Sequence, residues 1–132
     1  MAVEAREQQT EPLHNIDVTF PHGLPGFEDH REFRLEAPPE LAPFRILRSR
    51  DQEEVAFILV DPRLVVDGYS VAELNGQEAE WLVGAVVTLA DQPEKITVNL
   101  QAPVVIDRRR WQGRQLIMPE SPYSIRHPLL AG

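Results

Sequence analysis

The stretch from Ile96 to Met118 constrains the fold more than any other part of this chain. Apolar residues occupy every even position from Ile96 to Ile106, whereas positions 97, 99, 101 and 107 are polar. A period of two residues is typical of a strand with one buried face, so we expect the even side chains to face the core. The chain then becomes basic, passes Gly113 and returns to apolar residues at 116–118. This stretch predicts a β-hairpin with a basic tip.

Pro103 lies within the predicted strand and has no N–H group to donate to a neighbouring strand. It therefore marks an edge strand, a bulge, or a point where the strand passes from one sheet to another. Since each of these features bends a sheet, we expect the sheet to be curved.

Short strands are predicted along most of the remaining chain. Apolar and polar residues alternate at 16–20, 33–35 and 44–46, and the continuously apolar run 55–60 predicts a central strand covered on both faces. A further apolar strand at 81–89 contains Gly84, which indicates a bend or bulge. Ser70 and Glu73 have the spacing of a capping box, and Asn75 with Gly76 ends the short helix predicted there.

Together these elements predict a mainly β fold, a small antiparallel β-barrel-like domain of short strands with one short helix. With 132 residues, the chain is long enough for a single core but not for a second. We expect a flexible N-terminal tail at 1–14 and a single β domain at 15–132. The proline-rich segment after Pro119 is predicted to cross the surface, with Tyr123, Ile125 and Leu129 as its anchors.

Composition narrows the possible functional classes. The net charge of −8, from 21 acidic and 13 basic residues, disfavours non-specific nucleic-acid binding and favours a basic protein partner. The absence of cysteine excludes disulfides and thiolate zinc sites. Membrane spans need roughly 18 apolar residues in a row, a length that no run here reaches, and residues 1–12 lack the apolar core of a signal peptide. We therefore expect a cytoplasmic protein that does not bind a membrane.

No residue pattern indicates catalysis, a cofactor or a metal. The histidines at positions 14, 22, 30 and 127 lack the spacing of metal ligands. The chain has no cysteine nucleophile and no G-x-S-x-G motif. An enzyme that used the loop from His22 to Asp29 would require a concave pocket beside that loop. We expect no enzymatic activity, no cofactor and no metal site.

Several separated motifs occur in one order along the chain. They are Phe20 and Pro21 with the run Gly23 to Glu28, then Asp61 and Pro62, then Thr97 to Leu100 with Ala102 and Pro103, and finally Ser121 to Tyr123 with Arg126 to Pro128. This set, which spans roughly residues 16 to 130, resembles the flagellar assembly factor FliW family.

The resemblance implies a small, β-barrel-like bacterial cytoplasmic protein that binds other proteins and has no catalytic role. It implies two partners, newly made flagellin and the translational regulator CsrA. Binding of CsrA in this family blocks its repression of flagellin messenger RNA. The segment between Asp67 and Trp81 is shorter than the family's usual helix and linker.

The candidate partner-binding residues are Leu24, Phe27, Glu28, Asp29, Asp61, Asn99, Gln101 and Tyr123. Leu24 and Phe27 are displayed if their loop is a binding surface; alternatively, both side chains plug the end of the barrel. Asn99 and Gln101 either bind the backbone of a strand added by a partner, or are ordinary solvated strand residues. The acidic side chains in the set suit a basic partner.

An alternative function is binding of single-stranded RNA through the predicted hairpin tip. Arg108, Arg109 and Arg110 precede Trp111, and cations beside an aromatic ring are typical of single-strand binding. The negative net charge opposes this interpretation, and hairpin tips are commonly charged for solubility alone. We therefore expect no direct nucleic-acid contact and keep RNA binding as the alternative.

Overall fold

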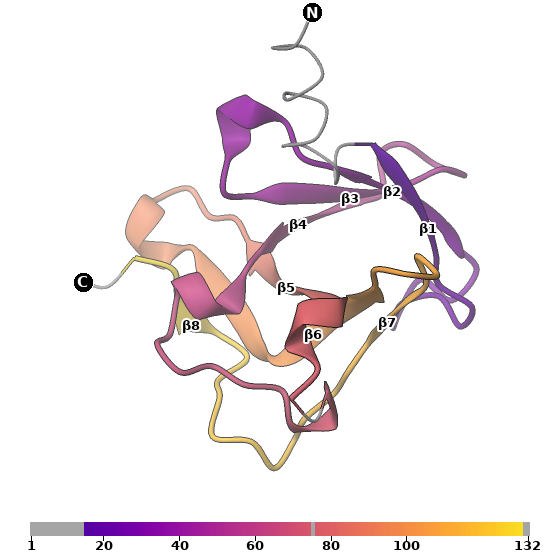
Figure 1. Ribbon diagram of the computed structural model, residues 1–132. Helices are drawn as coiled ribbons and strands as arrows, with labels where there is room; N and C mark the ends of the chain where they lie inside the picture. Colours follow the sequence, from indigo (N-terminus) through magenta and orange to yellow (C-terminus); the bar gives the residue numbers. More distant parts are fainter. Residues whose placement is uncertain (1–14, 75, 131–132) are drawn as a thin grey trace, which may run out of the picture.

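The structure, a computed structural model, describes residues 15–74 and 76–130; the tail predicted at 1–14 lies outside the described residues. Within them, eight strands follow one another: β1 (Ile16–Thr19), β2 (Glu32–Glu36), β3 (Arg45–Ser49), β4 (Ala56–Val60), β5 (Trp81–Thr88), β6 (Thr97–Asp107), β7 (Gly113–Gln115) and β8 (His127–Pro128). Strands β1 to β7 pair antiparallel in chain order, and β8 pairs with β6. The sheet curls around a common interior (Figure 1), which confirms the predicted mainly β, antiparallel fold.

The sheet is nearly closed into a barrel where β1 meets the hairpin formed by β6 and β7. Thr19 donates its N–H to the carbonyl oxygen of Trp111 over 3.0 Å and forms a parallel bridge with Gln112. Figure 1 shows β7 passing close to the end of β1. Because β1 ends at Thr19, this closure is confined to the tip of the hairpin, and β7 continues beyond it.

A large bulge in β6 corrects the predicted facing of its side chains. Gly84 and Val86 of β5 pair with Val104 and Asn99, so residues 100–103 of β6 lie opposite Ala85 alone. The bend predicted at Gly84 is therefore confirmed. The even residues from Val98 to Ile106 are buried, as predicted, but they do not share one face, because the extra residues around Pro103 reverse the alternation and bury Val105 as well.

The bulge divides the interior into two hydrophobic clusters. Before the bulge, Val98 and Leu100 belong to the first cluster; after it, Val105 takes that face, and Val104 and Ile106 turn to the second. The first cluster is built mainly from β5, the start of β6 and the segment 69–74. The second is built from β1, β2 and the end of β6.

The central strand β4 lies between the two clusters only at its last two residues. Leu59 and Val60 are buried in different clusters, as expected for a strand covered on both faces. Ala56 is exposed and Phe57 and Ile58 are half-buried, so the prediction of full coverage is wrong for the first part of the strand. Phe57 borders an open cavity, which explains its exposure.

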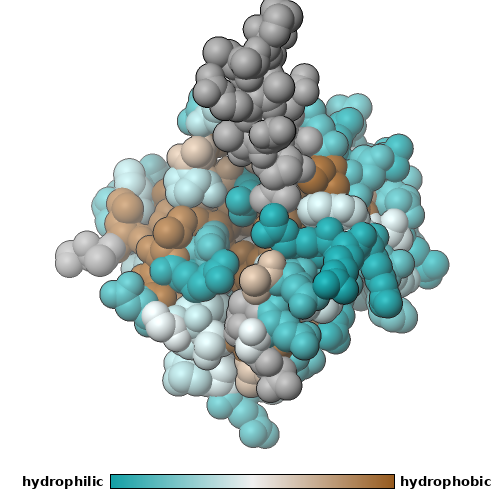
Figure 2. All heavy atoms as spheres, viewed as in Figure 1, coloured by the Kyte–Doolittle hydropathy of each residue, from teal (hydrophilic) through white to brown (hydrophobic). Residues whose placement is uncertain are grey.

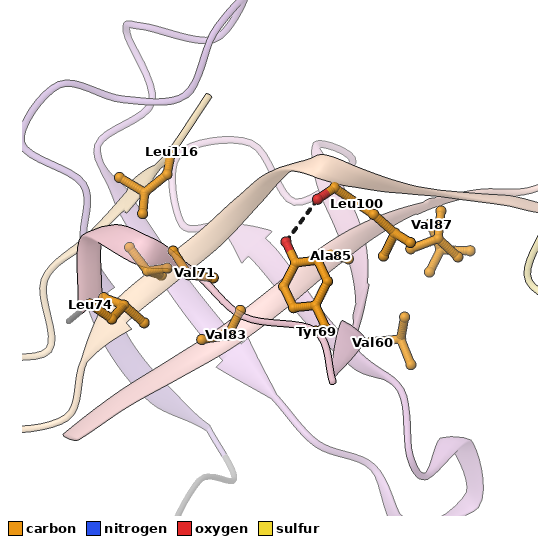
Figure 3. Close-up of a cluster of buried hydrophobic side chains, with 11 residues drawn as sticks. Val60, Tyr69, Val71, Leu74, Val83, Ala85, Val87, Leu100 and Leu116 are labelled. Atoms are coloured by element: carbon orange, nitrogen blue, oxygen red, sulfur yellow. Dashed lines mark hydrogen bonds between the residues drawn. The ribbon is translucent and has the colours of Figure 1, made fainter. Parts of the chain in front are cut away.

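Tyr69 fixes the bulge from inside the first cluster. Its side chain is 6% exposed, and its hydroxyl donates to the carbonyl oxygen of Leu100 over 2.8 Å. Figure 3 shows the ring beside Ala85, with its hydroxyl pointing toward that carbonyl. A bulged residue cannot use the regular ladder, so this side chain satisfies one of its backbone groups.

The described residues contain short 3₁₀ turns in place of longer helices: η1 (Pro39–Leu41), η2 (Pro62–Leu64), η3 (Ala72–Leu74), η4 (Glu78–Glu80) and η5 (Pro93–Lys95). The short helix predicted around Ser70–Leu74 is therefore a single 3₁₀ turn, η3. Burial of Val71 and Leu74 holds this segment against the core, and Gly76 follows with a φ of +83°. The segment between Asp67 and Trp81 contains η3 and η4.

The C-terminal segment, predicted to cross the surface, lies against β6. Leu100 donates its N–H to the carbonyl oxygen of Ser124, and Leu129 donates to that of Ile96. Tyr123 and Leu129 pack on the first cluster, but Ile125 is 53% exposed and is not an anchor. No helix among the described residues is long and apolar enough to cross a membrane.

The surface is divided between apolar and polar regions. Figure 2 shows apolar residues gathered on the left of the view, beside the C-terminal end, whereas the right-hand side is mostly hydrophilic. Among the described residues, the large apolar side chains that are more than half exposed are Leu64, Leu89, Ile117, Ile125 and Leu130.

Candidate partner-binding groove

A cavity of about 550 Å³ lies between the loop 21–28, the middle of the sheet and the C-terminal segment; we refer to it as the groove. Its lining residues are Leu24, Pro25, Phe57, Val86, Thr88, Thr97, Asn99, Val104, Gln115, Ile125 and Arg126. Two of the predicted partner-binding residues, Leu24 and Asn99, therefore face the same space. The groove combines an apolar floor with amide, hydroxyl and guanidinium groups.

The loop beside the groove is held by tight local hydrogen bonds. Gly23 has a φ of +66°, and a Cβ placed there would lie 2.6 Å from the Cα atom of Glu28, so only glycine fits. Phe27 donates its N–H to the carbonyl oxygen of Leu24 over 2.7 Å, and the Glu28 carboxylate accepts from the N–H of Gly26 over 3.1 Å. The backbone of this loop is therefore fixed before any partner is bound.

The two apolar side chains of the loop have different environments. Leu24 is 4% exposed and belongs to the second cluster, so it plugs the end of the barrel. Phe27 is 36% exposed, and its ring packs edge-to-face on Phe57 with 5.3 Å between centroids. Leu24 therefore plugs the end of the barrel, whereas Phe27 is a displayed side chain. Phe27 extends the apolar lining of the groove outward.

Asn99 and Gln101 make hydrogen bonds within the chain. The side-chain oxygen of Asn99 accepts from the N–H groups of Gln101 and Ala102, both over 3.1 Å, and so supports the bulge. The Gln101 amide donates to the carbonyl oxygen of Tyr123 over 3.3 Å. The Asn99 amide nitrogen has no hydrogen-bond partner among the described residues and remains available at the groove.

The outer edge of β7, together with residues 116–118 that follow it, is open beside the groove. Leu116 and Met118 donate their N–H groups to Pro103 and Gln101 of β6. In a strand the intervening residues point the other way, so the N–H groups of Gln115 and Ile117 face away from β6. Neither has a backbone partner among the described residues. This edge has the geometry that accepts an added strand.

Tyr123 packs inside the C-terminal segment. Its ring lies 4.4 Å from that of Tyr69, measured between centroids, and its hydroxyl accepts from the N–H of Ser70 over 3.2 Å. Burial raises the pKa of Tyr69 above its ordinary value, and the neighbouring Tyr123 adds to this rise. Tyr123 thus positions the segment that carries Ile125 and Arg126 to the groove.

The predicted acidic residues do not line the groove. Glu28 supports its own loop and Asp29 is exposed on it. Asp61 caps η2 by accepting from the N–H of Arg63 over 2.9 Å, and its carboxylate also accepts two bonds from the Arg63 guanidinium. Burial acts to raise the pKa of Asp61, but the hydrogen bonds from Arg63 outweigh it and hold that pKa below its usual range.

The basic hairpin tip is a turn held by its own hydrogen bonds and by contacts with Thr19 and Glu80. The Asp107 carboxylate accepts from the N–H groups of Arg109 and Arg110, which lowers its pKa. Trp111 adopts a φ of +54° and packs on the second cluster. Its ring therefore packs against the core of the protein and is less available to stack on a base than an exposed ring would be.

The groove lacks the groups that acid–base or metal chemistry requires. No carboxylate or imidazole is among the residues that line it. The described part of the chain also contains no cluster of three or more His, Cys, Asp or Glu residues suited to a metal ion. The arrangement suits binding of a polypeptide.

Sequence reasoning did not find the residues that the sheet brings to the groove, namely Phe57, Val86, Thr88, Gln115 and Ile125. They come from separate strands and from the C-terminal segment, and only the strand order places them together. The sequence analysis predicted Ile125 as a packed anchor, whereas the structure leaves it 53% exposed at the groove.

Comparison with known proteins identifies the family. The model of the family described as FliW protein matches residues 3–129. The chain belongs to the FliW family. It is 36% identical over 120 residues to the flagellar assembly factor FliW of Geobacter sulfurreducens, covering 84% of this chain and 74% of that protein.

Other members of the family agree in sequence and fold. The flagellar assembly factor FliW of Bacillus subtilis is 34% identical over 122 residues, covering 85% of this chain and 84% of that protein. A crystal structure of the flagellar assembly factor FliW superposes with a TM-score of 0.78 at 31% identity, covering 88% of this chain and 86% of the other. The curated relatives are named as assembly factors and not as enzymes.

Proposed function

We propose that this chain is a cytoplasmic flagellar assembly factor that binds a CsrA-type translational regulator and flagellin without catalysing a reaction. Binding of the regulator relieves its repression of flagellin messenger RNA, and binding of flagellin serves a chaperone-like role. Membership of the FliW family supports this proposal. The net charge of −8 also suits a basic regulator.

The open edge of β7 beside the groove is the observation that supports binding of a partner at this place. An extended segment of a partner that paired with Gln115 and Ile117 would gain main-chain hydrogen bonds. Its alternate side chains would point toward the groove, where Phe27 and Ile125 are partly exposed. The partner segment should therefore be extended and carry at least one apolar side chain in this register.

Calorimetric titration with the purified regulator and with flagellin tests the proposed function. We expect binding of each at micromolar concentration, and binding of the regulator should weaken with salt because exposed charges contribute. Lack of heat with both proteins at tens of micromolar would overturn the proposal. Gel retardation of an RNA pool, compared between the wild type and Arg109→Glu, tests the alternative of RNA binding.

A matched pair of variants tests the edge itself. Ile117→Pro removes the outward N–H, whereas Ile117→Ser removes the same exposed side chain and keeps that N–H. We expect Ile117→Pro to weaken binding about tenfold more than Ile117→Ser, the effect of losing roughly one main-chain hydrogen bond. Equal affinities of the two variants would show that partners bind elsewhere.

A further inference from the structure

A second cavity, of about 350 Å³, lies at one edge of the sheet and shares no lining residue with the groove. It lies beside the first residues of β3 and β5 and the residues that follow β4 and β6. The antiparallel order of the strands brings these four ends to the same side of the sheet. Arg45, Asp61, Arg63 and Arg108 line it, with Trp81 as an apolar wall. We refer to it as the arginine pocket.

The charges in the arginine pocket do not balance. It holds three guanidinium groups and one carboxylate, and both oxygens of that carboxylate already accept from Arg63 over 2.9 Å. The side chains of Arg45 and Arg108 have no hydrogen bond or ion pair with another described residue. Counted over its lining residues, the pocket therefore carries more positive than negative charge in a protein whose net charge is −8.

Arg45 is half-buried, so the excess of positive charge around it destabilises the protein when no anion is bound. Burial lowers the pKa of Arg45, Asp61 opposes this change, and Arg108 adds to it by repulsion between like charges. Proteins usually pair a buried charge, because removal from water without a partner is unfavourable. Two mutually repelling guanidinium groups around one cavity therefore leave a place for an anion.

We propose that the arginine pocket binds an oxyanion, a carboxylate or a phosphate group, between Arg45 and Arg108. Planar guanidinium groups donate paired hydrogen bonds to both kinds of oxyanion. Trp81 contributes an apolar wall for the atoms attached to the charged group. This site does not depend on the groove or on the identity of the protein partners.

Thermal unfolding and calorimetry with two probes test the site. The probes are inorganic phosphate and a tetraglutamate peptide with blocked ends, compared with chloride at equal ionic strength and with tetraglutamine. Binding of phosphate alone would identify the ligand as a free ion, and binding of the peptide alone would identify it as a carboxylate of a polypeptide. Either result supports the site. The variants are Arg45→Gln and Arg108→Gln, with Arg110→Gln as the control outside the pocket.

Each pocket variant should weaken binding about tenfold, which is the loss expected for a hydrogen bond to a charged group, while Arg110→Gln should leave it unchanged. Arg45→Gln should remain folded, since the guanidinium it removes has no partner, and Arg108→Gln lies on an exposed turn. Absence of binding by both probes, or equal binding by all three variants, would overturn the proposal.

Discussion

Replacement of Tyr69 by phenylalanine removes one hydroxyl from the core and keeps the aromatic ring. That hydroxyl donates to the carbonyl oxygen of Leu100 over 2.8 Å, at the bulge where four residues of β6 lie opposite Ala85. The variant would leave a buried carbonyl without this donor. An unsatisfied buried acceptor destabilises a protein by about 1–2 kcal/mol, so we expect the melting temperature to fall by roughly 3–8 °C.

Thermal and urea unfolding followed by circular dichroism would measure this effect. Tyr123→Phe is the matched control, because its hydroxyl accepts from an exposed N–H group of Ser70 and its loss should change stability by less than about 0.5 kcal/mol. If both variants melted at the same temperature as the wild type, the hydrogen bond to Leu100 would not support the bulge.

The same variant makes a prediction about alkaline pH. The pKa of Tyr69 is raised in the folded protein by burial and by Tyr123, so the folded state holds the proton more tightly than the unfolded state. This contribution is fully present below about pH 10, the ordinary tyrosine value, and is lost as pH rises toward the folded pKa. Tyr69→Phe should lose less stability than the wild type above pH 10; parallel decline would refute the assignment.

Substitutions at three further positions test the packing around β6. Gly113→Ala places a Cβ 2.6 Å from the ring of Phe20 and should destabilise by about 1–3 kcal/mol, and an unchanged urea midpoint would contradict this. Val98→Asp buries a charge at a position that is 0% exposed and should unfold the domain; a folded spectrum would show that the side chain faces outward. Asn99→Ala should cost about 1–2 kcal/mol while Asn99→Asp keeps the acceptor and most of the stability, a difference that denaturant unfolding detects.

Sequence periodicity was sufficient for β1 to β6 and for the antiparallel order, but it placed the second arm of the hairpin at 116–118 instead of Gly113–Gln115 and did not indicate β8. It was also sufficient to mark Pro103 and Gly84 as places where the ladder is irregular. It could not give the size of the bulge, because the number of residues opposite Ala85 depends on pairing between strands. For that reason the even residues Val104 and Ile106 are buried as predicted but face the second cluster, whereas Val105, predicted to face outward, is buried in the first.

The two candidate binding surfaces depend on tertiary structure more than on local pattern. The groove joins Leu24, Phe57, Val86 and Ile125, which are far apart in the chain and have no shared motif. In the same way, the arginine pocket forms because the ends of several strands lie together at one edge of the sheet. The capping-box pattern at Ser70 predicted a helix, but only one 3₁₀ turn fits between the buried side chains and Gly76.

The contact between Thr19 and Trp111 has a consequence for synthesis of the chain. Strands β1 to β4 form hairpins between neighbours, so they can pair as soon as they leave the ribosome. The edge of β1 acquires this partner only when Trp111 and Gln112 have been translated, after most of the domain exists. Nascent chains that stop earlier expose an unpaired strand edge, and such edges promote aggregation. Completion of the last hairpin therefore covers the Thr19 end of this edge.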